Sequence, residues 1–169
     1  MSELTIRIKK NPDGSATLSC TRADGSVTWQ RAHGQQGRFF PLHDLTHYTV
    51  ESVLGFGSGF FGLVAAGWDI QETGGQGARG PLPPEAITVE HIVGSLDAER
   101  AGGTTWTAAE FNAQAALFAA THGLAEPRML MDTELERLRA VREELLARWR
   151  ALPPGETLEL SFTNERESP

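Results

Sequence analysis

Apolar and polar residues alternate with a period of two at both ends of the chain, and this pattern constrains the fold more than any other feature. Near the N-terminus the alternation predicts strands at about 4–9, 16–22 and 27–32, separated by two turns that contain glycine. Near the C-terminus it returns at residues 158–162 and predicts a fourth strand. Because short turns join antiparallel strands, we expect an antiparallel sheet of about four strands, three N-terminal and one C-terminal.

The residues between the third and fourth strands have helical spacing instead. The first helix is predicted to begin near Pro41, which suits a first turn, and to end at Leu54 before Gly55. Capping boxes at Thr107 and Thr133 predict the starts of two later helices. Four to five helices would cover one face of the sheet, at about 41–54, 59–70, 85–100, 107–122 and 133–149. The whole chain, 1–169, is then a single α+β domain.

Composition excludes several classes of protein. The chain has 169 residues, a formal charge of -7 and a pI of about 5.2, which argues against non-specific binding to nucleic acid or to an anionic membrane. Cys20 is the only cysteine, so an intramolecular disulfide and a multi-cysteine metal site are excluded. With no apolar signal core and no long apolar run, the expected location is the cytoplasm.

The first predicted helix carries a stripe of polar residues along the edge of its buried face: His43, Asp44, His47 and Glu51. Histidines four residues apart point to the same side of a helix and can share one zinc ion. We therefore predict His43, His47 and Glu51 as metal ligands and Asp44 as a catalytic base. A straight helix separates His43 from Glu51 by about 12 Å, so a third ligand such as His122 could also come from elsewhere.

This pattern leaves two functions open. One is a metal-binding domain, such as a zinc-dependent hydrolase with a peptide or small-molecule substrate. The alternative is a non-catalytic module for protein interaction or homodimer formation. In that alternative the stripe is a structural polar network on a half-wet helix face, and Phe56, Phe60 and Phe61 contribute to the interface.

Two adjoining motifs carry a resemblance to a group of bacterial proteins. Residues 43–51 have the form HDLxHxxxE, and residues 59–67 have the form GFxGLxAxG. Together they resemble uncharacterised bacterial proteins that also have an N-terminal strand region. The resemblance covers residues 43–67 and implies no known activity. It does imply that the polar stripe and the glycine-rich segment belong to one unit.

Overall fold

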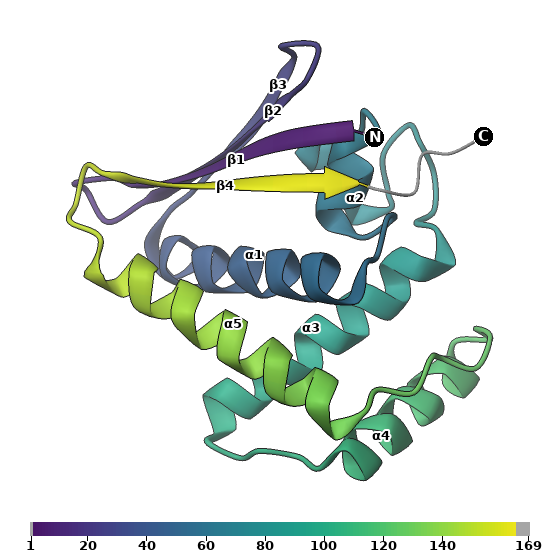
Figure 1. The fold of residues 1–169 in the computed structure, drawn as a ribbon. Helices are drawn as coiled ribbons and strands as arrows, with labels where there is room; N and C mark the ends of the chain where they lie inside the picture. The colour runs from purple at the N-terminus through teal and green to yellow at the C-terminus, as the bar shows by residue number, and fades with distance from the viewer. Residues whose placement is uncertain (1, 165–169) are drawn as a thin grey trace.

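Four strands form one antiparallel sheet in the order β3-β2-β1-β4 in the computed structural model, which describes residues 2–164 (Figure 1). Their bounds are β1 Ser2–Lys10, β2 Ala16–Arg22, β3 Val27–Ala32 and β4 Thr157–Asn164. Ile6 pairs with Cys20 on one side and with Leu160 on the other, which aligns the apolar side chains on one face. The predicted α+β sheet, with three N-terminal strands and one C-terminal strand, is confirmed.

Five helices and a short 3-10 helix lie on that apolar face. They are α1 Gly34–Leu54, α2 Phe60–Ala65, η1 Ile70–Gly74, α3 Pro84–Gly102, α4 Ala108–Thr121 and α5 Asp132–Ala151. α1 lies directly under the sheet. α3 and α5 cross α1 on the side away from the sheet, and α4 lies farthest from the sheet (Figure 1). α1 is therefore the middle layer of the molecule.

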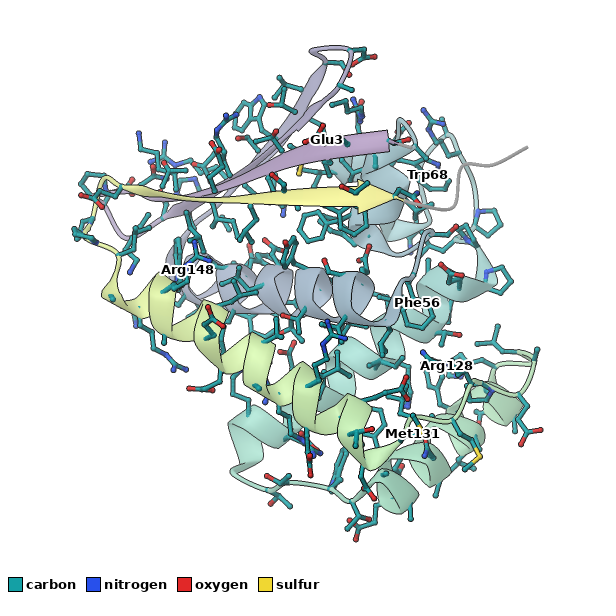
Figure 2. All side chains as sticks on the ribbon, in the orientation of Figure 1. Glu3, Phe56, Trp68, Arg128, Met131 and Arg148 are labelled. Carbon is teal, nitrogen blue, oxygen red and sulfur yellow. The ribbon has the colours of Figure 1, made fainter. Side chains whose placement is uncertain are left out.

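Two apolar clusters meet at α1. The first contains Leu45 together with residues of the sheet, α2 and α5. Side chains fill the space between the sheet and these helices (Figure 2). The second lies among α1, α3, α4 and α5, and it contains Val50. α1 therefore contributes a fully buried side chain to each of the two clusters.

α1 begins seven residues before the predicted start, at Gly34, and it contains Pro41 in its interior. The prediction was wrong because tertiary contact decides where this helix begins. A Cβ atom on Gly37 would lie 2.7 Å from the carbonyl oxygen of Ala32 and 3.1 Å from that of Gly14. Glycine thus lets the first turns of α1 pack tightly against the strand ends, although local propensity disfavours both glycine and proline there.

Of the two predicted capping boxes, one is confirmed and one is shifted. The Thr107 hydroxyl accepts a hydrogen bond from the Glu110 N–H, and the Glu110 carboxylate accepts one from the Thr107 N–H. At α5 the cap residue is Met131, whose N–H donates to Glu134, so the helix begins before Thr133. Within residues 2–164 no helix is both long enough and apolar enough to cross a membrane.

Candidate metal site

Three of the four residues in the polar stripe of α1 lie inside the protein, and the fourth, His43, has a side chain that is 22% exposed. Asp44 is 6% exposed, His47 2% and Glu51 1%, because the sheet covers one side of α1 and α3 and α5 cover the other. The expectation of a half-wet helix face was therefore wrong. A helix wheel identifies the side that one partner layer buries, but α1 has partner layers on both sides.

His47 lies between two carboxylates. Its Nδ1 is 3.3 Å from Oε1 of Glu51, one turn along α1, and its Nε2 is 3.2 Å from Oε1 of Glu90 on α3. Burial alone would lower the pKa of His47, but hydrogen bonds to Glu51 and Glu90 outweigh it and raise the pKa to about 10. The two acids thus favour the protonated form of the His47 ring.

His43 has a carboxylate partner of its own on α3. Its Nδ1 is 2.7 Å from Oδ2 of Asp97. Oδ1 of Asp97 accepts a hydrogen bond of 3.4 Å from the Thr46 hydroxyl and lies 3.8 Å from the Arg100 guanidinium. These contacts fix the ring of His43 from α3, one turn of α1 before His47.

The structure brings His43, His47 and Glu90 together as a group that could hold a metal ion. One ligand atom from each residue lies within 4.8 Å of the other two. Nδ1 of each histidine faces a carboxylate outside this group, which leaves Nε2 of each ring for a metal. A carboxylate behind the imidazole fixes the tautomer and the orientation that a metal ligand needs.

Glu90 is the member of this group that sequence reasoning missed. It lies 43 positions after His47 on another helix, and its side chain is 46% exposed. Nothing local distinguishes it from an ordinary surface acid. The one available signal was its spacing from Asp97, because residues seven apart share a face of a helix and could together meet two histidines.

Glu51 lies outside the group of three and has different partners. Its Oε1 accepts a hydrogen bond of 3.2 Å from the Phe61 N–H, and its Oε2 accepts one of 3.0 Å from the Gly62 N–H, both in α2. A Cβ atom on Gly59 would lie 2.4 Å from Cδ of Glu51, so the glycine-rich segment packs directly on this carboxylate. Direct ligation by Glu51 stays a prediction, and the contacts shown are those of an orienting partner for His47.

Asp44 is buried beside both histidines and accepts no hydrogen bond from any residue in the described part of the chain. Burial raises the pKa of its carboxyl group to about 7, although the charges of His47 and His43 lower it. A buried carboxyl group without a donor is costly to ionise, so Asp44 is poised to exchange a proton near neutral pH.

Aromatic rings flank the group at both ends. The ring of Phe39 stacks on His43 with centroids 5.3 Å apart, and that of Phe60 lies 5.5 Å from His47. Phe61 is fully buried, and Phe56 and Phe60 pack against the apolar clusters. Phe61 is therefore a core residue, whereas Phe56 and Phe60 are only partly buried, and their contribution to an interface stays a prediction.

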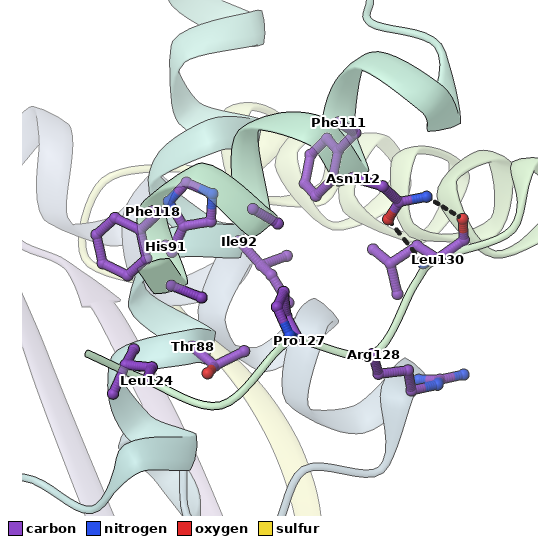
Figure 3. Close-up of a pocket in the computed structure, with 12 residues that line it drawn as sticks. Thr88, His91, Ile92, Phe111, Asn112, Phe118, Leu124, Pro127, Arg128 and Leu130 are labelled. Atoms are coloured by element: carbon purple, nitrogen blue, oxygen red, sulfur yellow. Dashed lines mark hydrogen bonds between the residues drawn. The ribbon is translucent and has the colours of Figure 1, made fainter. Parts of the chain in front are cut away.

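A small apolar pocket lies between α3 and α4 (Figure 3). None of the residues that line it belongs to the metal group. The ring of Phe118 lies between those of His91 and His122, with centroids 4.2 Å and 4.0 Å away. The side chain of Asn112 closes the pocket by bonding both the N–H and the carbonyl of Leu130. The free volume of about 10 Å³ is enough for no more than about one water molecule. His122, the other predicted source of a ligand, thus lies away from His43 and His47.

No protein-family model, curated protein or solved structure is significantly similar to this chain. The geometry described above is therefore the only basis for assigning a function.

Proposed function

We propose that the chain binds one zinc ion through Nε2 of His43, Nε2 of His47 and a carboxylate oxygen of Glu90, and that it acts as a hydrolase. The observation that carries the proposal is the approach of three ligand atoms to within 4.8 Å, with both histidines oriented by carboxylates. Two imidazoles and one carboxylate form a ligand set of catalytic zinc sites, in which water takes the fourth position.

The surroundings of the group support hydrolysis rather than a purely structural ion. A structural zinc site has four protein ligands, whereas three are assembled here and Glu90 is half exposed to solvent. Zinc lowers the pKa of bound water to about 7. Asp44 is the base proposed to accept the proton of that water, because its carboxyl group is buried beside both histidines.

Metal binding at this site displaces a proton. Nε2 of His47 must lose its hydrogen before it can donate a lone pair, and Glu51 keeps the hydrogen on Nδ1 in place. Glu90 then exchanges an ion pair with His47 for a bond to the metal. Glu51 acts as a positioning residue, and Asp97 acts in the same way on His43.

The test is a zinc titration of untagged protein by calorimetry, with elemental analysis of the purified chain. We expect one equivalent of zinc and a rise in melting temperature on adding it, because a ligand that binds only the folded state stabilises it. Glu90→Ala should weaken binding by more than the about 10–100-fold that loss of an orienting partner costs, and Glu51→Gln should fall within that range.

The matched control is His33→Ala, which removes an exposed histidine outside the site. It should bind zinc like the unmodified chain. Less than about a tenth of an equivalent of any transition metal in the purified protein, together with no stabilisation by added zinc, would remove the proposal. Glu90 is half exposed, so Glu90→Ala is expected to fold, and equal zinc affinity in this variant would exclude Glu90 as a ligand.

A further inference from the structure

Gly94 lies in the middle of α3, where neither packing nor backbone conformation requires a glycine. Gly37 and Gly62 are explained by backbone atoms that a Cβ would strike, at 2.7 Å and 2.3 Å respectively. A Cβ on Gly94 would meet no described atom within 4 Å, and its φ is that of an ordinary helical residue. Glycine destabilises a helix interior relative to alanine, so Gly94 lowers the stability of α3 and makes no contact that only a glycine would allow.

The position of Gly94 relates it to the metal group. It follows Glu90 by four residues and precedes Asp97 by three, which places all three on one face of α3. Glu90 contacts His47 and Asp97 contacts His43, so this face runs along the edge of the metal group. Gly94 itself is exposed, and the missing side chain leaves open space between the two acidic residues.

Aromatic rings and carboxyl groups surround the two histidines that this face of α3 meets. Phe39, 43% exposed, stacks on His43 at one end, and Phe60 lies against His47 at the other. Four carboxyl groups surround the histidines: Asp44, Glu51, Glu90 and Asp97. In the described part of the chain, Arg100 is the one arginine or lysine that forms an ion pair with any of them.

We propose that Gly94 keeps open the entrance to the metal, and that this entrance admits substrates with a neutral or positively charged group beside the reacting bond. The proposal rests on the metal-binding function proposed above. An aromatic or other apolar group of the substrate fits against the exposed ring of Phe39. Even with the two positive charges of zinc counted, a phosphate or carboxylate beside the reacting bond would meet the carboxylates of Glu90 and Asp97 and is disfavoured, since like charges in a partly buried site repel.

The probes are a cobalt(II)-loaded protein and three hydroxamic acids, which bind a catalytic metal as bidentate ligands and change the visible spectrum of cobalt. Unsubstituted benzohydroxamic acid tests access, and its 4-aminomethyl and 4-carboxy derivatives test charge. We expect the 4-aminomethyl compound to bind at least 10-fold more tightly than the 4-carboxy compound. Gly94→Phe should weaken benzohydroxamate at least 10-fold while the affinity for cobalt alone is unchanged.

Two further variants separate access from folding. Ala140→Phe places the same ring on an exposed position of α5 and should leave hydroxamate binding unchanged. Gly94→Ala should raise the melting temperature, because alanine is the better helix former. A lower melting temperature for Gly94→Ala would show that the glycine is structural and would overturn the inference.

The remaining outcomes distinguish this inference from the metal-binding proposal. If cobalt binds and Gly94→Phe takes up benzohydroxamate as the unmodified chain does, the entrance is elsewhere and the metal site stands. Loss of cobalt binding in Gly94→Phe would mean that Gly94 is needed to form the metal site itself, and it would overturn the inference about the entrance. Equal affinity for the two charged probes would overturn the substrate class. Failure of the unmodified chain to bind cobalt would overturn both proposals.

Discussion

The side of α1 that faces the sheet differs in its chemistry from the middle of the side that faces α3. Toward the sheet the helix presents Leu45, which is fully buried in an apolar cluster with strands β1, β2 and β4. Toward α3, the middle of the same helix presents His43 and His47, which meet acidic side chains. Apolar packing needs only shape and volume, whereas every polar group on the α3 side needs a partner in a specific place.

The difference indicates which side the chain keeps for stability. Burying apolar area stabilises a fold directly, at about 25 cal/mol per Å². A buried ion pair contributes little net stability, because the two charges lose their hydration before they gain each other. The group around His47 is thus a poor way to hold α1 against α3, and a chain selected for stability alone would have apolar residues there.

Leu45→Ala tests the side of α1 that faces the sheet, and it should cause the largest loss of stability. We expect the free energy of unfolding to fall by about 3 kcal/mol, within the range of about 2–5 kcal/mol for leucine truncation in a core. Urea denaturation measures the loss, and zinc stoichiometry should remain that of the unmodified chain. A loss below about 1 kcal/mol would mean that the sheet side of α1 is loosely packed.

Glu51→Gln should have an intermediate effect from the other side. The glutamine oxygen can replace one carboxylate acceptor, but its NH2 group then faces a donor among His47, Phe61 and Gly62. Leaving such a donor unpaired costs about 1–3 kcal/mol, measurable by urea denaturation without zinc. Glu144→Gln, on an exposed position of α5, is the matched control and should change stability by less than about 0.5 kcal/mol. Equal stability of the two variants would contradict the role given to Glu51.

Cys20 offers the mildest test and needs no mutation. Burial, with a smaller contribution from the charge of Asp44, raises the pKa of this thiol to about 12. Thiolate is the reactive form, so the native protein should not react with an aromatic disulfide reagent at pH 8. The unfolded protein should release one equivalent of the reagent's thiol per chain. Rapid labelling of the native protein would show that the sheet opens away from α1 without global unfolding.

The sheet was predictable because its signals are local. Alternation places Leu4, Ile6 and Ile8 on one face, and the turn chemistry after β1 and β2 sets the pairing of three strands. The start of α1 was not predictable in this way. Residues 34–41 contain two glycines and a proline, and they become helical because Gly37 fits against the carbonyl groups of Gly14 and Ala32. That fit exists only once the strands have formed.

The site was half predictable for a related reason. His43, Asp44, His47 and Glu51 lie on one helix, so their spacing alone shows that they share a side. Their burial and their partners depend on α3, whose packing on α1 brings Glu90 to His47 and Asp97 to His43. The register between two helices is set by the whole of their interface, and no residue on α1 specifies it. For this reason Glu90 and the orienting role of Asp97 emerged only from the structure.

The pairing of β1 with β4 has a consequence for how the chain reaches this fold. One edge of β1 is completed only by β4, and the contact of Ile8 with Leu158 joins residues 150 positions apart. A fold that depends on contacts so distant in sequence forms slowly, because the chain loses the entropy of a very long loop before the strand pair stabilises it. Until then the backbone N–H and C=O groups along that edge of β1 lack their strand partners and can pair with a strand of another chain. Joining Ser2 to Asn164 by a short linker and opening the chain at the loop of residues 75–83 would make the β4–β1 contact a hairpin, which should speed folding without altering the structure.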